Sequence, residues 1–470
     1  MPIATTNPAT GELLRSFEPM TEEQIDAAIG RADLAYRQLR DIPVERRGRW
    51  LTAAADLLEA ERDEIARLMT TEMGKTYAAA KAEVTKCATA CRFYAAEAPG
   101  FLADEPADAQ AVKATRAYVR YQPIGPVLAV MPWNFPLWQV LRFAAPALMA
   151  GNTGLLKHAS NVPQTALLLE DLFRRAGFPE GAFTTLLVGS AEVDRVLSDP
   201  RVRAATLTGS EGAGRSIAQI AGRELKKTVL ELGGSDPFVV MPSADLDRAA
   251  EAATTARCQN NGQSCIAAKR FVVHTDVFDA FAERFAANMS ALRVGDPMDP
   301  DTDVGPLASE GGRDEVHAQV RDAVDRGATV LCGGEPPAGP GWFYPPTVVT
   351  DLGPEMRMWS EEVFGPVAGL YRVSSYEEAI EVANGTCFGL GSNAWTRDPE
   401  EQERFATDLD AGNVFVNGIT TSYPELPFGG VKNSGYGREL SALGMREFCN
   451  TKTVWVGEGA ASAGAGAHAE

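Results

Sequence analysis

Residues 126–158 read PVLAVMPWNFPLWQVLRFAAPALMAGNTGLLKH, and they contain one complete structural unit. Residues 127–131 form a short apolar run that predicts a buried strand, and residues 134–151 form a longer apolar segment that predicts a helix. Residues 154–157 are a second short apolar run. A strand, a helix and a strand in this order predict a β–α–β unit whose two strands are parallel.

The same alternation continues along the chain in both directions from this unit. Apolar runs separated by helical stretches predict further strands at residues 184–188, 204–207, 228–230, 238–240, 271–274, 347–349 and 414–416. These runs fall into two sets, one before and one after Glu231. We therefore predict an α/β protein with two parallel sheets, each covered by helices on both faces.

The first hundred residues are mostly helical, because their apolar positions recur at helical spacing through residues 47–73 and 78–98. Thr21 is followed three positions later by Gln24, a pairing that predicts a capped helix start.

Two segments alternate residue types with a period of two and predict strands outside the main sheets. They are residues 117–123 and 452–457, which we interpret as an antiparallel arm. Exposed strand edges of this kind pair readily with another subunit. The tail at 457–470 is rich in Ala and Gly, and we expect it to be disordered.

Length and charge exclude several classes of protein. The 470 residues predict two or three domains, and the formal net charge of −19 argues against a nucleic acid partner, because so acidic a surface repels phosphate backbones. No apolar run reaches the roughly 18 residues that a membrane helix needs. The N-terminus has no signal-peptide pattern.

The seven scattered cysteines favour a reducing cytoplasm over a disulfide framework. Cys87 and Cys91 lie one helical turn apart, but no nearby His or further Cys completes a metal site, so we interpret them as core residues. Cys258 is interpreted in the same way. We expect no metal.

Cys265 has the most informative surroundings in the chain. It follows the turn-forming run Asn-Asn-Gly-Gln-Ser, which presents it on a loop. Glu231 ends a predicted strand and runs into two glycines, and Asn134 stands at the start of the predicted helix. Each residue alone has an ordinary structural explanation. The combination of a nucleophile, a base and an amide indicates a catalytic site.

Seven motifs stand around these residues: PWNFP at 132–136, LKHAS at 156–160, LTGS at 207–210, LELGG at 230–234, GQSC at 262–265, EEVFGPV at 361–367 and PFGG at 427–430. Their content and order resemble those of the aldehyde dehydrogenase superfamily, and the resemblance covers residues 7–456.

The resemblance implies an aldehyde dehydrogenase-like fold with two Rossmann-like domains and a small antiparallel oligomerisation arm. It divides the chain into three parts. The cofactor-binding domain comprises residues 1–114 and 127–230, the catalytic domain comprises residues 231–425, and the bridging arm comprises residues 115–126 and 426–456. A homodimer or homotetramer is the assembly that the resemblance implies.

The resemblance also assigns chemical roles. Cys265 is the nucleophile that adds to the aldehyde carbon and later carries a thioester. The Asn134 amide and the backbone N–H of Cys265 stabilise the oxyanion, and Glu231 is the general base for hydrolysis of the thioester. These residue types suit the reaction, because thiolate is both a strong nucleophile and a good leaving group. An unperturbed thiol is only a few per cent thiolate at neutral pH, so Cys265 needs activation.

The cofactor site lacks the usual GxGxxG spacing. A predicted strand at 204–207, followed by Gly209, Ser210 and a helix, nevertheless offers free N–H groups to a pyrophosphate. By resemblance, Gly209 and Ser210 lie at the diphosphate. The remaining residues that the resemblance assigns to the nicotinamide and its ribose are Trp133, Leu232, Glu362 and Phe364.

The motif LKHAS indicates which dinucleotide is bound, through Lys157, His158, Ala159 and Ser160. Many relatives that prefer NAD carry Glu where Ser160 stands. A carboxylate there repels a 2′-phosphate, whereas Ser160 leaves room for it and Lys157 supplies positive charge. We therefore expect NADP, with NAD used less efficiently. His158 replaces the Pro that is commonest in the family, and a structural role suits it better than ligation.

Arg142 lies on the apolar helix after Asn134, at a spacing that puts Asn134, Trp138 and Arg142 on one face. A buried guanidinium needs a partner. The residues alone leave two alternatives equally open, a carboxylate on the substrate and an internal Asp or Glu.

Within the superfamily the chain is most similar to bacterial NADP-dependent succinate-semialdehyde dehydrogenases, in which an Arg at this position binds the substrate carboxylate. By the same resemblance, Ser264 and Ser422 donate hydroxyl groups to the substrate. This chain departs from the mammalian members at two positions. It has Gln259 where they have a second Arg, and Ala267 where they have a regulatory Cys.

Three alternatives remain at this stage. The same chemistry can act on another small aldehyde, such as glutarate semialdehyde or an uncharged aliphatic aldehyde. A non-catalytic relative of the family is the second alternative, although the three catalytic residues are intact. The third, a cysteine hydrolase, needs a His beside Cys265, and the four His residues lie in no recognisable partner motif.

Overall fold

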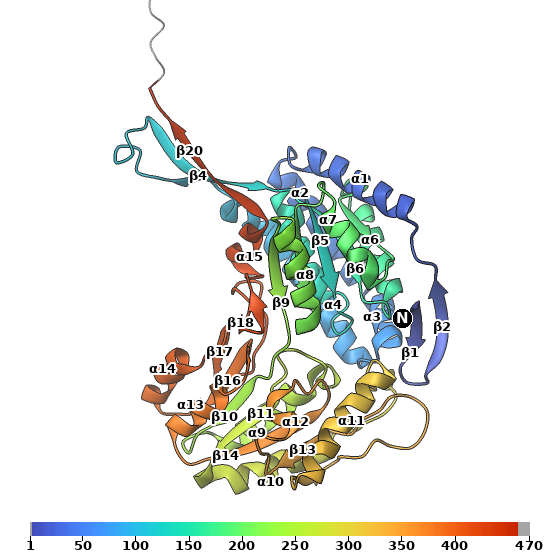
Figure 1. The fold of residues 1–470 in the computed structure, drawn as a ribbon, viewed down its shortest axis with the longest axis vertical. Coiled ribbons are helices and arrows are strands. Elements are labelled where there is room, and N and C mark those ends of the chain that lie inside the picture. Colours follow the sequence, from blue (N-terminus) through green and yellow to red (C-terminus); the bar gives the residue numbers. More distant parts are fainter. Residues whose placement is uncertain (1, 459–470) are drawn as a thin grey trace, which may run out of the picture.

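The computed structural model describes residues 2–458, which form two bodies and a projecting arm (Figure 1). Each body is built around a sheet that is mainly parallel. The parallel strands of the two sheets divide the sequence at Glu231, as predicted, whereas the short strand Gly435–Tyr436 returns to the first sheet. Most of the predicted disordered tail, residues 459–470, lies outside the described residues. No helix within 2–458 has the length and apolar character needed to cross a membrane.

The first sheet has six strands in the order β19-β9-β8-β5-β6-β7. Its five long neighbours run parallel, and β19 is antiparallel to β9. The chain steps one way from β5 to β7 and then returns to the other side of β5 for β8 and β9. Such a reversal opens a crevice at the carboxyl ends of the strands, where α/β proteins bind ligands. The strands are β5 (Pro126–Met131), β6 (Thr153–His158), β7 (Phe183–Thr185), β8 (Ala204–Thr208), β9 (Lys227–Glu231) and β19 (Gly435–Tyr436).

The second sheet has seven strands in the order β12-β13-β14-β11-β10-β16-β17, of which only β12 is antiparallel to its neighbour. In its core the ring of Phe271 packs at a tilt against the rings of Phe238 and Phe285, with centroids 5.3 and 4.6 Å apart. The strands are β10 (Pro237–Val240), β11 (Arg270–His274), β12 (Thr329–Cys332), β13 (Thr347–Thr350), β14 (Val367–Val373), β16 (Gly391–Trp395) and β17 (Asn413–Val416).

Helices cover both sheets. The Thr21 capping box is present as predicted, whereas the predicted helix at 47–73 is two helices that meet at Glu61. The first body carries α1 (Glu22–Leu39), α2 (Val44–Ala60), α3 (Arg62–Met73), α4 (Tyr77–Phe101), α5 (Trp138–Ala150), α6 (Pro163–Arg175), α7 (Val193–Ser198), α8 (Glu211–Arg223) and α15 (Ser441–Glu447). The second carries α9 (Leu246–Cys258), α10 (Thr275–Ala291), α11 (Glu310–Asp325), α12 (Arg357–Ser360), α13 (Tyr376–Asn384) and α14 (Pro399–Asp408). The 3₁₀ turns are η1 (Ser190–Glu192) and η2 (Gln259–Gly262), and the short strand pairs are β1 (Ile3–Asn7) with β2 (Glu12–Phe17) and β15 (Phe388–Gly389) with β18 (Val431–Lys432).

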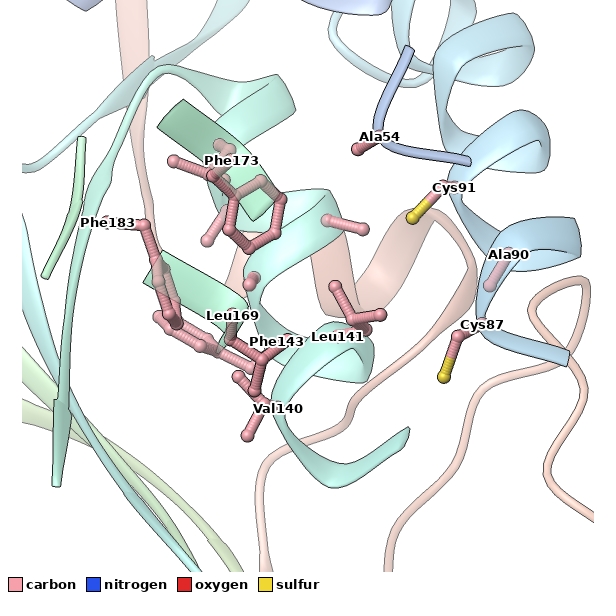
Figure 2. Packing of buried hydrophobic residues seen from close by; sticks show 14 of the residues in the cluster. Ala54, Cys87, Ala90, Cys91, Val140, Leu141, Phe143, Leu169, Phe173 and Phe183 are labelled. Carbon is pink, nitrogen blue, oxygen red and sulfur yellow. The ribbon is translucent and has the colours of Figure 1, made fainter. Parts of the chain in front are cut away.

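Helix α5 is buried along its whole length between α4 and the first sheet. Figure 2 shows Leu141 and Phe143 of α5 between Cys87 and Cys91 of α4 and the rings of α6 and β7. Both cysteines are fully buried, which confirms that they are core residues. Because α5 has no exposed face, any polar group that it carries must find a partner inside the protein or in a cavity.

The arm is a three-stranded antiparallel sheet in the order β20-β4-β3, and it projects from the first body (Figure 1). Strand β4 (Arg116–Pro123) pairs with β20 (Cys449–Val456) over eight residues, and β3 (Glu105–Pro106) covers part of the other edge of β4. The two predicted arm strands are therefore present. Residues 426–448, however, do not extend the arm, because β18, β19 and α15 pack back onto the bodies.

Candidate active site

Cys265 lies in the loop between α9 and β11, and this loop begins with a left-handed turn. Asn260 and Asn261 have φ angles of 54° and 58°, and Gly262 has a φ angle of 73°. Asparagine and glycine adopt this region more readily than other residues. The run Asn-Asn-Gly therefore redirects the chain after α9 and presents Cys265 on a loop, as predicted.

Hydrogen bonds hold this loop on both sides of Cys265. Before it, Asn261 Nδ2 donates to the carbonyl oxygen of Gly74 at 2.8 Å. After it, Lys269 Nζ donates to the carbonyl oxygens of Ser264 at 2.8 Å and of Cys265 at 2.7 Å. A backbone held in this way keeps the N–H of Cys265 in a fixed direction, which an oxyanion donor requires.

Cys265 lines two cavities of about 230 Å³ each. One, here called the helix-side cavity, is bounded by α4, α5 and the residues around Ser422. The other, here called the strand-end cavity, is bounded by the segments that follow β5, β8 and β9. Among the described residues lining them, Cys265 alone belongs to both. The thiol can therefore contact one ligand from each side.

The thiol of Cys265 is strongly disfavoured as a thiolate. Burial raises the pKa of Cys265 to about 12, against the opposing effect of the cations Arg142 and Lys269. Glu362 and Asp236 add to the rise. Cys265 is therefore protonated at neutral pH until a positive group or a base comes beside it, which agrees with the expectation that it needs activation.

Asn134 lies in the turn between β5 and α5 and not on the helix. The predicted common face of Asn134, Trp138 and Arg142 is therefore wrong. Helix α5 begins only at Trp138, because Pro136 disfavours a helical conformation at Phe135. Trp138 and Arg142 line the helix-side cavity, and Asn134 lines the strand-end cavity.

The side chain of Asn134 is tied to the Cys265 loop. Its Nδ2 donates to the carbonyl oxygen of Gln263 at 3.1 Å, and the backbone carbonyl oxygen of Asn134 accepts from Asn260 Nδ2 at 2.8 Å. A primary amide has two N–H donors, so one remains for a ligand. This geometry suits an oxyanion donor held beside the sulfur.

Glu231 is the last residue of β9, and its carboxyl group is fully buried with no hydrogen-bond partner in the described chain. Burial raises the pKa of Glu231 well above the usual value, and the nearby carboxyl group of Glu439 raises it further. Arg142 acts in the opposite direction. A buried carboxyl group with a raised pKa can accept a proton near neutral pH, as a general base must.

Arg142 forms a buried ion pair with Glu439. Its Nη2 lies 3.4 Å from Thr208 Oγ1, and its guanidinium lies over the Phe428 ring. The structure thus provides the internal carboxylate that the sequence left open as an alternative. Arg142 also lines the helix-side cavity, so its role as a substrate ligand stays a prediction.

The strand-end cavity has features that suit part of a dinucleotide. It opens at the N-terminus of α8, where Ser210 is the N-cap and a Cβ atom at Gly212 would meet no heavy atom within 4 Å. Free N–H groups and open space at a helix N-terminus suit a pyrophosphate. At the Cys265 end, the rings of Trp133 and Phe364 pack edge to face at 5.8 Å. The cavity lining also includes the predicted Gly209, Leu232 and Glu362.

The ends of β6 and β5 lie side by side, because Met131 pairs with His158. Lys157 and Ser160 therefore stand at the same edge of the sheet as the strand-end cavity. Lys157 forms no ion pair within residues 2–458, and burial lowers the pKa of its ammonium group. An unpaired lysine beside a small hydroxyl residue suits a phosphate group better than a ribose alone.

The helix-side cavity is mainly apolar, with a few polar groups that point into it. The hydroxyl of Ser264 is fully buried and has no hydrogen-bond partner among the described residues. Ser422 Oγ accepts from Lys86 Nζ and from Trp138 Nε1, both at 2.9 Å. Gln259 also lines this cavity and contributes a neutral amide at the position where mammalian members have a second Arg.

A model of the aldehyde dehydrogenase family matches residues 1–454 of this chain. The chain belongs to the aldehyde dehydrogenase family. The resemblance carried by the seven motifs is therefore confirmed, and so is the fold that it implied, with two parallel-rich sheets and a separate antiparallel sheet.

Curated relatives and solved structures cover nearly the whole of this aldehyde dehydrogenase. The succinate-semialdehyde dehydrogenase [NADP(+)] of Mycolicibacterium paratuberculosis is 65% identical over 472 residues, which is 100% of both chains. Succinate-semialdehyde dehydrogenase [NADP(+)] 1 of Mycobacterium tuberculosis is 65% identical over 456 residues, 97% of this chain and 100% of the relative. A crystal structure of succinic semialdehyde dehydrogenase from Streptococcus pyogenes in complex with NADP+ has a TM-score of 0.94 at 40% identity, and the match covers 97% of this chain and 100% of that one.

One residue named in the cofactor site of this aldehyde dehydrogenase needs correction. The ring of His158 is buried. Its Nδ1 lies 2.9 Å from the backbone nitrogen of Ala159 and 3.2 Å from the carbonyl oxygen of Met131, and its Nε2 lies 3.0 Å from the carbonyl oxygen of Pro136. Burial lowers the pKa of His158 to about 4, so the ring is neutral. Both nitrogens are engaged within the protein, and the imidazole is structural.

Lys86 is the residue of the helix-side cavity that sequence reasoning missed. It lies on α4 within a segment interpreted only as a helix, and its contacts with Trp138 and Ser422 depend on residues far along the chain. Its spacing within α4 gives no sign of a binding role.

Proposed function

We propose that this aldehyde dehydrogenase oxidises succinate semialdehyde to succinate with NADP. The observation that carries the proposal is the position of Cys265 in the linings of both cavities, one suited to an aldehyde and the other to a dinucleotide. The names of the relatives, which are 65% identical over the full chain, support the substrate and the cofactor.

The reaction begins at the sulfur of Cys265. The thiol gives its proton to water and the sulfur adds to the aldehyde carbon, so that the carbonyl oxygen becomes an oxyanion. The free N–H of the Asn134 amide and the backbone N–H of Cys265 donate to that oxyanion. One donor of this kind is typically worth about 3 kcal/mol.

The strand-end cavity would hold NADP, which supplies a hydride acceptor when it is bound. Gly209 and Ser210 would bind the pyrophosphate, and Trp133 and Phe364 would shape the pocket for the nicotinamide. Loss of hydride from the tetrahedral carbon leaves a thioester on Cys265.

Glu231 completes the cycle as a general base. Its carboxylate accepts a proton from water, the water oxygen attacks the thioester carbon, and the thiolate of Cys265 leaves. Burial and the neighbouring Glu439 support this role, because both raise the pKa of Glu231 towards neutrality.

Lys157 and Ser160 support the use of NADP. Lys157 offers an unpaired ammonium group and Ser160 a hydroxyl at the sheet edge that bounds the strand-end cavity. A 2′-phosphate binds such a pair by charge and hydrogen bonding, and NAD lacks that group.

We also propose that the chain works as a homodimer or homotetramer in the cytoplasm. The arm supports the assembly, since β20 pairs with β4 on one side only. Seven cysteines that form no disulfide support a reducing compartment.

A matrix of substrates and cofactors tests the proposed function. Purified protein is supplied with succinate semialdehyde, glutarate semialdehyde or butanal, each with NADP or NAD, and reduced nucleotide is followed by absorbance. We expect the highest kcat/KM for succinate semialdehyde with NADP, and a loss of at least about 1000-fold in Cys265→Ala. A higher kcat/KM for butanal, or for NAD, would contradict the proposal, as would turnover by the alanine variant.

A further inference from the structure

We propose that Lys86 on α4 binds the distal carboxylate of the substrate, together with the hydroxyl of Ser422. This inference rests on the proposed function, because it requires a substrate with a carboxylate. It makes Lys86 a specificity-determining residue for aldehydes that carry an acid group.

The position of Lys86 supports this role. Its side chain lines the helix-side cavity that Cys265 also lines. Its ammonium nitrogen lies 4.2 Å from the centroid of the Trp138 ring and donates to Ser422 Oγ at 2.9 Å. Lys86 has no Asp or Glu within ion-pair distance among residues 2–458. An ammonium group has three donors, and one neutral oxygen does not satisfy them.

The hydrogen bonds of Ser422 point to the same ligand. Its oxygen accepts from Lys86 Nζ and Trp138 Nε1, so both lone pairs are occupied. A serine hydroxyl has one further function, its own proton, which must be donated to an acceptor. Ser422 Oγ donates to no acceptor in the described chain. A carboxylate placed beside Lys86 would accept this proton and the ammonium hydrogens together.

The other charged groups around the cavity are already paired. Arg142 is bound to Glu439, and the carboxyl group of Glu83 is bound to Lys75 and to the backbone N–H groups at the start of α5. Lys86 is thus left as the cation with no internal counter-charge. A buried charge without a partner is costly, so the cavity favours an anionic ligand.

The electrostatics of Lys86 agree with this geometry. Burial, together with the neighbouring Arg142, lowers the pKa of Lys86 to about 8, while Cys87 and Glu83 act in the opposite direction. A carboxylate that binds here relieves the repulsion between the two cations.

The test compares an acidic and a neutral aldehyde of equal chain length in three variants. Lys86→Met removes the charge and keeps an unbranched side chain, Lys86→Arg retains a cation, and Lys81→Met makes the same change on α4 outside the cavity. For each variant, kcat and KM are measured with succinate semialdehyde and with butanal, and NADP binding is measured by fluorescence to confirm a folded protein.

We expect Lys86→Met to lower the ratio of kcat/KM for succinate semialdehyde to that for butanal by about tenfold or more, mainly through KM. Lys86→Arg should recover most of that ratio, and Lys81→Met should keep the ratio of the unchanged enzyme. Equal losses on both aldehydes, or an unchanged ratio in Lys86→Met, would overturn the assignment of Lys86. If the unchanged enzyme itself shows no preference for succinate semialdehyde over butanal, the proposed function fails instead.

Discussion

Glu231 ends β9 as a buried carboxyl group beside Glu439 and Arg142, and this setting predicts the pH dependence of turnover. The raised pKa keeps Glu231 protonated to a higher pH than an ordinary glutamate, and a protonated carboxyl group cannot accept a proton from water. We therefore expect kcat to rise with pH along a limb that lies well above pH 4.5. Steady-state rates between pH 5 and 9 measure this limb.

Glu231→Gln separates the two half-reactions in the same experiment. The variant should still release a burst of NADPH near one equivalent per active site, because thioester formation does not use the base. Its steady-state rate should fall by about 100-fold or more. Steady turnover at the rate of the unchanged enzyme would show that another group activates the water.

Ser160 offers a direct test of nucleotide choice. Ser160→Glu places a carboxylate at the sheet edge that we assign to the 2′-phosphate, and like charges in contact repel strongly. We expect kcat/KM with NADP to fall on the order of 100-fold while kcat/KM with NAD changes much less. Ser160→Ala is the matched control, since it adds no charge. A similar loss with both nucleotides in Ser160→Glu would place the 2′-phosphate elsewhere.

The sequence predicted single residues well where local chemistry marks them. Cys265 was predicted to lie on a loop because the run Asn-Asn-Gly-Gln-Ser forms turns, and the structure has a left-handed turn at that run. The residues that contact the buried cations Arg142 and Lys86 could not be predicted from local sequence. Glu439 meets Arg142, and Ser422 meets Lys86, across some 300 residues of chain. Such contacts depend on how helices pack, which a local pattern does not record.

At the scale of elements, α4 and α5 are joined through the Glu83 side chain. Its Oε1 accepts from the backbone N–H groups of Leu137 and Trp138, both at 2.9 Å, and its other oxygen pairs with the buried Lys75. The start of α5 has no side-chain cap of its own. Glu83 therefore supplies from another helix the acceptor that the first turn of α5 lacks.

Glu83→Ala should destabilise the protein strongly, because it leaves Lys75 as an unpaired buried cation and uncaps α5. We expect a loss of about 3–5 kcal/mol, seen as a marked decrease in the thermal unfolding temperature. Glu97→Ala, at an exposed position on the same helix, should change stability by less than about 0.5 kcal/mol. Equal unfolding temperatures for the two variants would contradict the role of Glu83.

The predicted elements were most reliable where strands are apolar. All nine predicted strands of the two sheets are present. Three strands of the second sheet were not predicted: β12, the apolar β14 and β16. Strand β16 was missed because its sequence, Gly-Ser-Asn-Ala-Trp, has little strand propensity. Its place in the sheet depends on tertiary contacts instead, since Asn393 Nδ2 donates to the carbonyl oxygen of Pro237 in the neighbouring strand at 3.3 Å.

The arm is the feature of the whole molecule that bears on assembly. One edge of β20 has no partner strand in the described chain, and Trp455 on it is 55% exposed. Unpaired edges with exposed apolar side chains are costly in isolation and suit contact with a second copy. The arm was predicted to include all of residues 426–456, but only β20 of that segment belongs to the arm sheet.

Trp455→Glu should weaken the assembly by placing a charge on that edge. We expect the mass measured by light scattering to decrease towards a single chain of 50.2 kDa at micromolar concentration. Leu34→Glu, at a position 61% exposed on α1, is the matched control and should keep the mass of the unchanged protein. An unchanged mass in Trp455→Glu would exclude this edge of β20 as the contact between subunits.

The two linings that meet at Cys265 carry a consequence for how such an enzyme can change over time. They share no other residue, although Arg142 and Asn260 of one lining contact Thr208 and Asn134 of the other. A substitution away from these contacts, such as one at Lys86, is therefore expected to alter the acceptance of an acid group and leave the nucleotide walls in place. Effects of distant, independent sites combine multiplicatively in rate. Selection can thus adjust the aldehyde and the coenzyme separately, one wall at a time, without rebuilding the chemistry between them.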